Sequence, residues 1–448
     1  MRTDREHSLY YLIKESELNK DIELLRGALR DNWGDNSIMG YSVKTNSLPW
    51  LLNHLRKEGF YAEVVSDSEY DLARRLGYDA DKIIYNGPIK DRAVFKQVIK
   101  DGGIVNLDSN YELDWLEEMS ASSMAIKVGI RINADIASLS PNEELLEEDG
   151  GRFGYCLENG TVAQVIERIK SMPNVKLSGL HLHSSTKSRS VEVYGALAKL
   201  AVNVARDYNL DIEYIDMGGG YFGGRDDMPN YRDYFGVIAR VLSECFSKDK
   251  VTLIAEPGVS LVSRASSLIT EVIDTKDIRG HRYVVTTGSR VLLNPQVTRH
   301  TYPHHIEYME SLTATRVNNL SDSKATEGEN NLSGSKAAAG VDNLSETSTT
   351  AALTDLPAPD DPRQPLPSQW ICGSTCMEYD RLFEIRDGAE LKPGDRVVYD
   401  LAGGYTIALS PLFIHYFPKV IIEKITGETF VARDEWTNDE FLMKNHWE

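Results

Sequence analysis

Eight short apolar runs recur along the first 260 residues, and each run stops on polar, ionisable or glycine residues. Most runs are followed by a helical pattern, and alternating strands and helices favour a parallel sheet. Eight such units are the number in a (β/α)8 barrel, so we expect an α/β chain that begins with a TIM-like barrel. The runs are Ile38–Val43, Tyr61–Ser66, Lys82–Gly87, Gly103–Ser109, Ala125–Asn133, Lys176–His183, Ile212–Gly220 and Thr252–Gly258.

The carboxyl ends of these runs carry residues that can do chemistry. In (β/α)8 barrels the functional residues lie at this end of the strands. We therefore expect an active site built from Lys44, Glu63, Arg131, His181, His183, the triple glycine Gly218–Gly220 and Glu256.

The overall composition of the chain limits the kinds of partner that it can bind. The chain has 448 residues and a formal charge of −19, which argues against nucleic acid and anionic membranes as partners. No apolar run approaches the roughly 18 residues of a membrane span. The amino terminus lacks a hydrophobic leader, and the four cysteines are too few and scattered for a disulfide framework. We expect a cytoplasmic protein.

After the eighth run, the alternating pattern of strands and helices gives way to strand-like segments. Strand-like segments such as His281–Thr287 and Lys419–Lys424 predict a mostly antiparallel β domain. Tyr10–Lys14 is either a strand of that domain or the lead into the first helix. We expect the barrel at 27–265, the β domain at 1–26, 266–314 and 367–448, and an insertion at 315–366.

The insertion has a composition of its own. It is rich in Ser, Asn, Thr, Ala, Gly and Pro, has no aromatic residue before Trp370, and repeats Asn-Leu-Ser at Asn319, Asn331 and Asn343. Such a segment cannot bury enough apolar surface to offset the entropy of ordering, which predicts disorder. We interpret it as a tolerated insertion at a loop tip, with docking of a partner as the alternative.

Lys44 directly follows the first run and permits two interpretations. A single lysine is usually a solvated surface charge. At the mouth of a barrel, however, burial can lower the pKa of the amine and make it a nucleophile that forms a Schiff base.

Glycines follow the seventh run and an acid ends the eighth. Gly218–Gly220, with Gly223 and Gly224, form either a tight turn or a phosphate cradle, and five glycines within seven residues favour the cradle. Glu256 is either a structural ion-pair partner or an acid that holds a pyridine nitrogen protonated.

His181 and His183 point the same way along a regular strand, but no third ligand has metal-binding spacing, so we predict no metal site.

A lysine for an imine, a phosphate cradle and an acid for a ring nitrogen together indicate pyridoxal 5′-phosphate. The order of the motifs resembles the fold-type III decarboxylases, the family of diaminopimelate and eukaryotic-type ornithine decarboxylases, outside the insertion. The motifs are Tyr41-Ser-Val-Lys-Thr-Asn46, Glu63-Val-Val-Ser-Asp-Ser-Glu69, Arg131-Ile-Asn133, Arg152-Phe-Gly154, His181-Leu-His-Ser-Ser185, Gly218–Gly220, Glu256-Pro-Gly258, Cys372-Gly-Ser-Thr-Cys-Met-Glu-Tyr-Asp380 and Ala402-Gly-Gly-Tyr405.

This resemblance implies a role for each matching residue. Lys44 would form the imine with the cofactor, His183 would stack on its ring, and Glu256 would pair with the pyridine nitrogen. Cys376 would reach in from the neighbouring subunit of a homodimer with shared active sites and protonate the carbanion, and Asp380 would lie at the substrate. The residues implied around the phosphate are Ser185, Gly218, Gly219, Gly220, Gly258 and Tyr405.

The sequence also departs from the family at the expected substrate site. The acidic residue that normally follows the motif's second cysteine is Met377, and the arginine that normally follows Glu-Pro-Gly is Val259. Glu63 replaces an aspartate, and the shortened loop after His183 leaves Ser184 and Ser185 in competition for the phosphate. An apolar side chain cannot replace a charge-assisted contact to a distal ammonium. The resemblance therefore implies intact cofactor chemistry with an altered substrate pocket.

We interpret the chain as a PLP-dependent α-decarboxylase of an amino acid or amino-acyl compound, including one linked to a carrier. Two alternatives stay open. A racemase would use the same cofactor with a second base on the opposite face. A catalytically inactive relative would keep the fold as a binding protein, although the retention of Lys44, Glu256 and Cys376 argues against it.

Overall fold

The computed structural model describes residues 8–141, 151–184, 189–223, 225–295, 302–309 and 365–446. Ser185 and residues 315–364 of the expected insertion lie outside these ranges. The chain divides into two compact units. The first comprises Met1–Leu9, Leu268–Arg290 and Thr298–Asp400, and the second comprises Tyr10–Ser267, Val291–Val297 and Leu401–Glu448.

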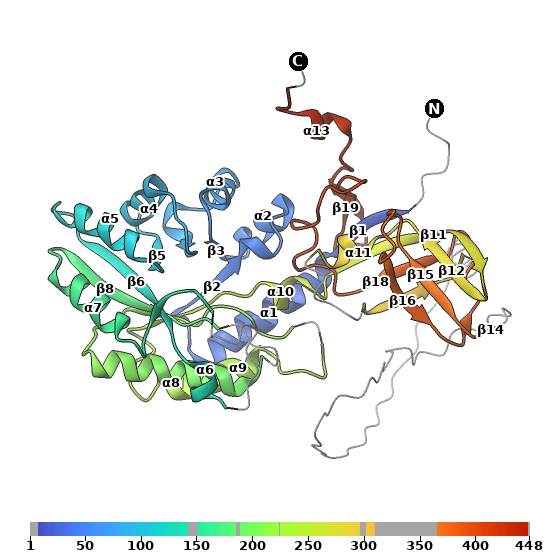
Figure 1. The fold of residues 1–448 in the computed structure, drawn as a ribbon. Helices are drawn as coiled ribbons and strands as arrows, with labels where there is room; N and C mark the ends of the chain where they lie inside the picture. The colour runs from blue at the N-terminus through green and yellow to red at the C-terminus, as the bar shows by residue number, and fades with distance from the viewer. Residues whose placement is uncertain are drawn as a thin grey trace, which may run out of the picture. The chain divides into compact units, whose positions relative to one another are not determined.

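The second unit contains a closed ring of eight parallel strands, which confirms the predicted barrel (Figure 1). The ring closes because β5 pairs with β6 on one side while β2 pairs with β10 on the other. The two-residue strand β7 (Tyr155–Cys156) is added to β6 outside the ring. The barrel strands are β2 (Ser37–Ser42), β3 (Tyr61–Val64), β4 (Ile83–Tyr85), β5 (Ile104–Leu107), β6 (Ile126–Asn133), β8 (Val175–His181), β9 (Tyr214–Asp216) and β10 (Thr252–Ala255).

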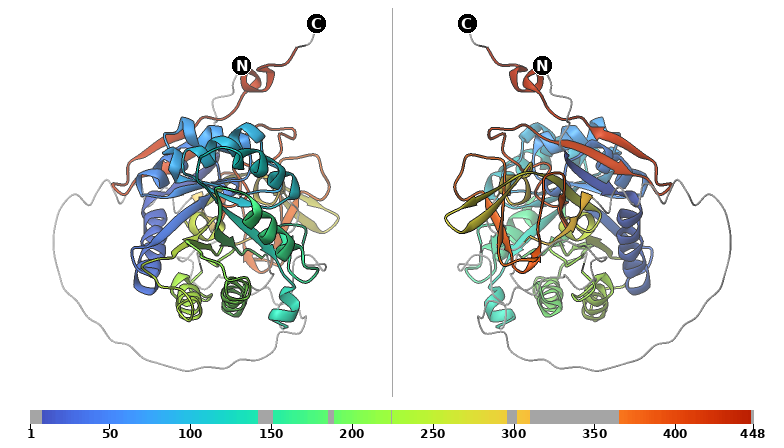
Figure 2. Two further views of the ribbon diagram at one scale, coloured as in Figure 1. Left: turned by 90° about the vertical axis from the view of Figure 1, so that its left-hand side faces the viewer. Right: turned by 90° about the vertical axis from the view of Figure 1, so that its right-hand side faces the viewer.

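Helices cover the outside of this ring (Figure 2). The first long helix precedes the first barrel strand, and only the short α10 (Val259–Val262) directly follows the last. None of the described helices combines the length and the apolar character that a membrane span requires. The long helices are α1 (Glu15–Asn32), α2 (Pro49–Lys57), α3 (Asp67–Arg75), α4 (Arg92–Lys100), α5 (Asn110–Ser120), α7 (Thr161–Ser171), α8 (Val191–Asp207) and α9 (Tyr231–Leu242).

Side-chain caps set where several helices begin. Ser66 accepts a hydrogen bond from Glu69 N at the start of α3, and Asp91 accepts from two backbone amides at the start of α4. Asn230 and Asp233 form a capping box at the start of α9. These caps satisfy amides that have no partner within the helix. They therefore fix the points at which the βα loops end.

The interior of the barrel consists of an apolar layer followed by a polar layer. Ile84, Tyr214 and Ile254 form a buried cluster, against which Ile38, Tyr61 and Ile104 pack. Side chains two residues apart on a strand face the same side. On five strands the residue two positions beyond this apolar layer is polar and buried: Glu63, Asn86, Asn106, Asp216 and Glu256. The functional end of the barrel therefore begins directly above its hydrophobic core.

Tyr214 joins the two layers. Its ring lies against the backbone of two neighbouring strands, where a Cβ built on Gly179 would come within 2.0 Å of the ring and one on Gly129 within 2.3 Å of its hydroxyl. The hydroxyl group donates to Asn106 Oδ1 at 2.9 Å. Glycine at both positions thus makes room for an aromatic ring whose polar end reaches the upper layer.

The first unit is a mostly antiparallel β structure, as predicted. The strands β12 and β18 both pair antiparallel with β11, while β15 pairs parallel with β12. The remaining antiparallel pairs are β13 with β18, β15 with β16, and β14 with β17. The strands are β11 (Ser266–Ile278), β12 (His281–Thr286), β13 (His304–Glu307), β14 (Pro365–Leu366), β15 (Gln369–Cys372), β16 (Arg381–Ile385), β17 (Gly388–Ala389) and β18 (Arg396–Tyr399).

Tyr10–Lys14 belongs to a strand, β1 (Leu9–Lys14), and α1 begins at the next residue. Tyr10–Lys14 pairs in parallel with β19 (Lys419–Glu423), and β19 pairs antiparallel with β20 (Thr429–Arg433). All three of these paired segments fall in the same compact unit as the barrel. Further short helical segments among the described residues are α6 (Ile136–Leu139), α11 (Arg290–Leu293), α13 (Asn438–Leu442) and the 3-10 turn η2 (Ala80–Lys82).

The close approach at Tyr214 gives a stability prediction. Gly179→Ala should lower the free energy of unfolding by about 1–3 kcal/mol, because the added methyl group overpacks the barrel interior. Gly27→Ala in α1 is the matched control, since its Cβ would meet only Arg232 Nη2, at 3.8 Å. The control should be neutral or more stable by about 0.5–1 kcal/mol. Urea denaturation of both variants measures the difference, and equal stabilities would contradict this account of the interior.

Candidate active site

Lys44 lies in the 3-10 turn η1 (Val43–Thr45), immediately after β2. Its Nζ donates to Glu63 Oε2 at 2.8 Å, and its side chain remains 42% exposed. Burial favours a lower pKa for Lys44, but the negative charges of Glu63 and Glu256 outweigh burial and raise it. The amine is therefore held as an ammonium group at the open end of the barrel, with water access.

Glu63 is the buried partner of this lysine. Only 1% of the residue is exposed, and its Oε2 also accepts from Ser42 Oγ at 2.7 Å. Burial opposes ionisation of Glu63, but the charge of Lys44 and the hydrogen bonds from Lys44, Ser42 and Asn86 lower its pKa. Glu63 is thus the ionised carboxylate of the polar layer.

A chain of side-chain amides connects Glu63 to the other acids. Asn86 Nδ2 donates to Glu63 Oε1 at 3.1 Å and to Glu256 Oε1 at 2.7 Å. Asn106 Nδ2 donates to Asn86 Oδ1 at 3.0 Å and to Asp216 Oδ2 at 3.1 Å. The polar layer is therefore one hydrogen-bonded network that crosses the inside of the barrel.

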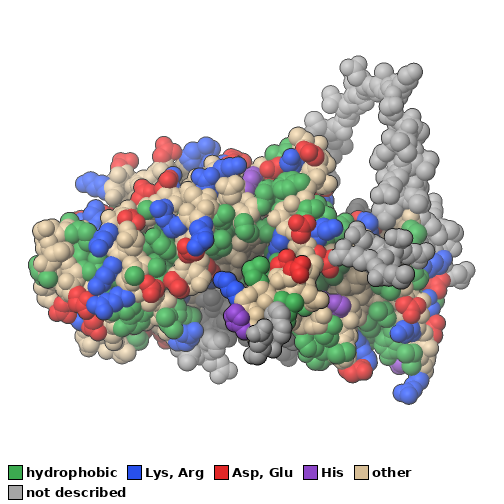
Figure 3. All heavy atoms as spheres, turned by 90° about the horizontal axis from the view of Figure 1, so that it is seen from above, with side chains coloured by type: hydrophobic (Ala, Val, Ile, Leu, Met, Phe, Trp, Pro, Cys, Tyr) green, Lys and Arg blue, Asp and Glu red, His purple; other side chains and the backbone are tan. Residues whose placement is uncertain are grey.

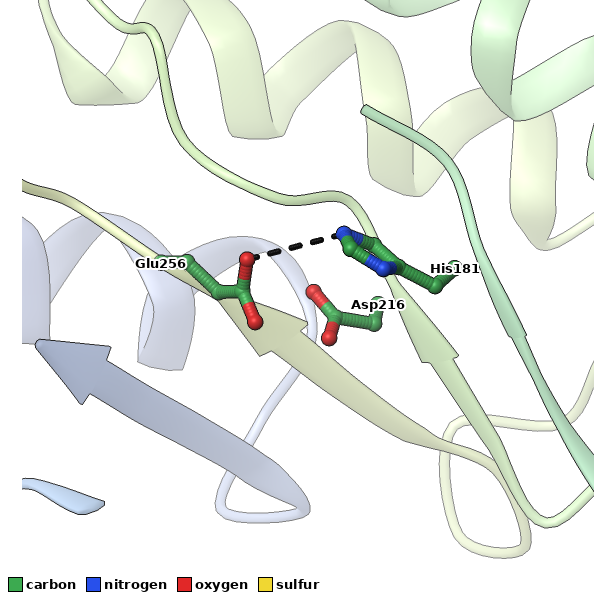
Figure 4. Close-up of side chains that lie close together, drawn as sticks. All are labelled: His181, Asp216 and Glu256. Carbon is green, nitrogen blue, oxygen red and sulfur yellow. Dashed lines mark ion pairs between the residues drawn. The ribbon is translucent and has the colours of Figure 1, made fainter. Parts of the chain in front are cut away.

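Glu256, Asp216 and His181 meet at one side of this network (Figure 4). His181 Nε2 lies 3.6 Å from Glu256 Oε2, and neither ring nitrogen of His181 has a hydrogen-bond partner among the described residues. Burial, and then the positive charge of Arg131, hold the pKa of His181 well below its ordinary value, so the ring is neutral.

Burial raises the pKa of Glu256 well above its ordinary value, and the charges of Asp216 and Glu63 raise it further. Burial also raises the pKa of Asp216. The two carboxyl groups hydrogen-bond each other, so they hold a proton between them.

Atoms of His181, Asp216 and Glu256 lie within 4.8 Å of one another, so they could also hold a divalent cation. Such a cation would compete with a ring nitrogen for Glu256.

The glycine turn follows β9 and is held by side chains on both sides. Gly218 N donates to Asp216 Oδ1 at 2.9 Å, and Gly219 N donates to His183 Nδ1 at 3.3 Å. Gly220 N has no acceptor among the described residues. Gly218 and Gly220 have φ angles of 62° and 91°, which favour glycine. Of the three amides, only that of Gly220 therefore lacks an acceptor among the described residues.

His183 lies two residues beyond β8, beside this turn. Burial, followed by the positive charges of Arg131 and Lys44, lowers its pKa to about 3. The guanidinium group of Arg131 contacts Asp108 at 3.8 Å and donates to the His183 carbonyl at 3.5 Å. The structure thus presents His183 as a neutral ring whose backbone and Nδ1 are both held.

Gly258 and Tyr405 approach the lysine turn from two other loops. A Cβ on Gly258 would lie 2.2 Å from Thr45 Oγ1, and Tyr405 N donates to Thr45 O at 2.9 Å. The side chain of Val259 fits against Gly404, where a Cβ would come within 2.8 Å of it. Val259 therefore packs against the turn before Tyr405.

Cys376 and Asp380 lie in the first unit, on the loop between β15 and β16. Cys376 is exposed. Asp380 is buried, and its two carboxylate oxygens accept from Ser289 Oγ, Arg290 N, and both the amide and hydroxyl groups of Thr375. Through these hydrogen bonds, Asp380 fixes the conformation of the loop on which it lies. The expected role of Asp380 at the substrate stays a prediction.

Asn86, Asn106 and Asp216 were not among the residues expected from the sequence to form the site, whereas Glu63, Arg131 and His181 were. The structure shows that all six are buried or half-buried and linked to Lys44, Glu256 or His183. The available signal was a polar residue two positions after an apolar one on several strands. In contrast to these buried polar residues, the surface shown in Figure 3 carries acidic and basic side chains that are interspersed.

The fold and the polar layer define a barrel protein with an amine and buried acids at the ends of its strands. The family profile described as pyridoxal-dependent decarboxylase, pyridoxal binding domain, matches residues 19–263. That match spans more than half of the chain, so the chain belongs to the pyridoxal-dependent decarboxylases. The cofactor of the matched domain is pyridoxal phosphate.

Individual relatives show how far the similarity extends. The probable chloroplastic diaminopimelate decarboxylase of Oryza sativa subsp. japonica is 28% identical over 304 residues, 65% of this chain and 60% of the rice protein. The L-glutamyl-[BtrI acyl-carrier protein] decarboxylase of Niallia circulans is 23% identical over 419 residues, 90% of this chain and 86% of that protein. The crystal structure of M. jannaschii diaminopimelate decarboxylase with L-lysine superposes with a TM-score of 0.76 at 20% identity, covering 98% of this chain and 92% of that chain.

The described residues fit pyridoxal phosphate. Lys44 offers a primary amine, and Gly220 offers an N–H group without an acceptor in the described part of the chain. Glu256 has only the neutral His181 ring within ion-pair distance among the described residues, so it can accept a cationic ring nitrogen. These groups match an aldehyde, a phosphate and a pyridine nitrogen.

The neutral state of His183 predicts how stability depends on pH. The pKa of His183 is about 3 in the folded chain and about 6.5 when unfolded, so between these values only the unfolded chain takes up the proton. The free energy of unfolding should therefore fall as pH drops from about 6.5, by up to about 1.4 kcal/mol per pH unit for this residue. His181 adds a dependence of the same sign.

His183→Asn should reduce that slope by up to about 1.4 kcal/mol per pH unit, because one titrating group is removed. Urea denaturation of the cofactor-free protein at pH 7, 6 and 5 measures the slope. His281→Asn, at an exposed position, is the control and should leave the slope unchanged. An unaltered slope in the His183 variant would show that folding does not lower the pKa of this ring.

Proposed function

We propose that this protein is a PLP-dependent α-decarboxylase of an amino acid or amino-acyl substrate. The supporting observation is the network that joins Lys44 to Glu256. Lys44 Nζ contacts Glu63, and Glu63 and Glu256 share the amide group of Asn86. An amine and a ring-nitrogen acid are therefore held within one rigid layer, as a pyridine electron sink requires.

When bound, pyridoxal phosphate supplies an aldehyde that captures an amine and a protonated pyridine ring that stabilises the negative charge left by loss of carbon dioxide. Lys44 would hold the cofactor covalently until a substrate amine replaces it, after which Glu63 would pair with the released Lys44 ammonium group. Glu256 would keep the ring nitrogen protonated. The neutral His183 ring would lie against the cofactor ring, and Gly220, Gly258, Tyr405 and Ser185 would bind the phosphate.

The acid that returns the proton is proposed to be Cys376. Because the family resemblance places this cysteine in the site of a neighbouring subunit, the proposal includes a homodimer with shared sites. We also propose that the protein acts in the cytoplasm on a small molecule, without nucleic acid or membrane partners. The charge of −19 supports the exclusion of nucleic acid.

The role of Lys44 gives a direct spectroscopic prediction. Lys44→Ala should abolish the absorbance band of the cofactor–lysine linkage in the PLP-loaded protein, because no other primary amine occupies that position. Borohydride reduction and mass spectrometry should place the cofactor on Lys44 of the unaltered protein. Lys127→Ala, which removes a surface lysine paired with Glu213, is the control and should keep the band. Cofactor trapped on another lysine would refute the assignment.

We further propose a substrate without a distal ammonium group. Met377 replaces the acidic residue that would contact such a group, and the side chain of Glu378 is 95% exposed and accepts from Arg381 at 3.3 Å. The Niallia circulans relative, which aligns over 90% of this chain, is named for a carrier-linked glutamyl substrate. A glutamyl group attached to a carrier therefore belongs among the substrates to test.

Carbon dioxide release should accordingly be greater with L-glutamate or a glutamyl thioester than with L-ornithine or meso-diaminopimelate. Met377→Asp should raise kcat/KM for the diamino acids roughly tenfold or more, the value of a hydrogen bond to a charged group. Glu378→Gln is the control and should leave the preference unchanged. Efficient turnover of ornithine or diaminopimelate by the unaltered protein would overturn the proposed substrate class.

The same assay in deuterated water separates the two alternatives. A racemase would exchange the α-hydrogen without releasing carbon dioxide. An inactive binding protein would do neither, even though it binds the cofactor. Carbon dioxide release with a single incorporated deuterium supports the decarboxylase.

A further inference from the structure

The side chain of Asn86 lies between two carboxylates that serve different parts of the site. Its Nδ2 donates to Glu63 Oε1 at 3.1 Å and to Glu256 Oε1 at 2.7 Å, while its Oδ1 accepts from Asn106 Nδ2 at 3.0 Å. The residue is only 4% exposed. The protein therefore uses every polar group of this amide, and Asn86 links Glu63, the partner of Lys44, to Glu256.

The neighbours of Asn86 fix which way its amide points. A reversed amide would place Oδ1 against two carboxylate oxygens and the NH2 group against the Asn106 donor. Asn106 is fixed in turn, because its Oδ1 accepts from Tyr214 and its Nδ2 also donates to Asp216. Donors thus run in one direction from the Tyr214 hydroxyl group to Glu256. A fully satisfied buried network of this kind holds its members rigidly.

An amide is suited to this position because it carries no charge. A lysine or arginine at position 86 would neutralise Glu256 and compete with a protonated ring nitrogen for it. The amide group can bind the Glu63 carboxylate and the Glu256 carboxyl group without adding a charge of its own. Glu63 Oε2 remains with Lys44 and Ser42, so Asn86 occupies only the other oxygen of that carboxylate.

We propose that Asn86 is a positioning residue that holds the Glu256 carboxylate toward the cofactor ring nitrogen and the Glu63 carboxylate on Lys44. The inference rests on the proposed role of Glu256 in binding the ring. It predicts that part of the effect of Asn86 on the affinity for the cofactor depends on the presence of the ring nitrogen.

Two ligands test this prediction with the purified full-length protein. One is pyridoxal phosphate, and the other is its benzene-ring analogue, which has the same aldehyde and phosphate but no ring nitrogen. Spectroscopic titration gives Kd for both. Asn86→Ala should raise the Kd of pyridoxal phosphate roughly 10- to 100-fold, the effect of losing a hydrogen bond to a charged group. The Kd of the analogue should rise much less.

Additional variants separate the possible failures. Asn32→Ala removes a side-chain amide that, among the described residues, donates only to a helix carbonyl, so it should change neither Kd. In a cycle with Glu256→Gln, the Asn86 variant should add little further discrimination between the two ligands, because both residues act through one contact. Thermal unfolding checks the fold, and Asn86→Ser, which keeps one donor, should show an intermediate Kd.

An equal loss for both ligands in Asn86→Ala, or no loss, overturns the inference about Asn86. If Glu256→Gln itself fails to distinguish the two ligands, the proposed role of Glu256 fails instead. The two results are therefore distinguishable in the same set of titrations.

Discussion

The buried polar layer inside the barrel is the constraint on which the site depends. Three carboxyl groups, Glu63, Asp216 and Glu256, lie within it, and each is buried. Unpaired buried charges are costly, so every one of them needs a partner or a proton. Lys44 and two asparagine amides supply the partners, while Asp216 and Glu256 hold a proton between them. The positions of the reactive groups follow from this requirement.

The glycine turn belongs to the same layer. Asp216 accepts from Gly218 N with one oxygen and from Asn106 with the other, so the acid side of the network also shapes the anion side. His183 takes the next amide, that of Gly219. Asp216 therefore joins the hydrogen-bonded network of the acids to the glycine turn. This coupling explains why so many uncharged hydrogen-bonding groups are buried at one end of the barrel.

The two compact units have different parts in the proposed function. The barrel unit holds the groups expected to contact the cofactor, and the first unit carries Cys376 and Met377. The loop around these two residues is fixed by Asp380, whose oxygens bind backbone and hydroxyl groups on both sides of it. Substrate preference is therefore proposed to depend on a loop that is well held but that does not belong to the barrel.

The eight strands and the barrel could be predicted from the sequence alone, because strand periodicity is a local property of the chain. The assignment of Lys44, His183 and Glu256 to the cofactor rests on the order of the motifs and stays a prediction. The sequence left Tyr10–Lys14 ambiguous, since the parallel partner of that strand lies about 400 residues away. It did not reveal Asn86, Asn106 or Asp216 as site residues, although each follows an apolar residue by two positions. Only closure of the barrel brings these side chains from separate strands into one layer, where burial makes their hydrogen bonds necessary. The tertiary structure therefore decided how the reactive groups are held and which of the glycine amides remain available.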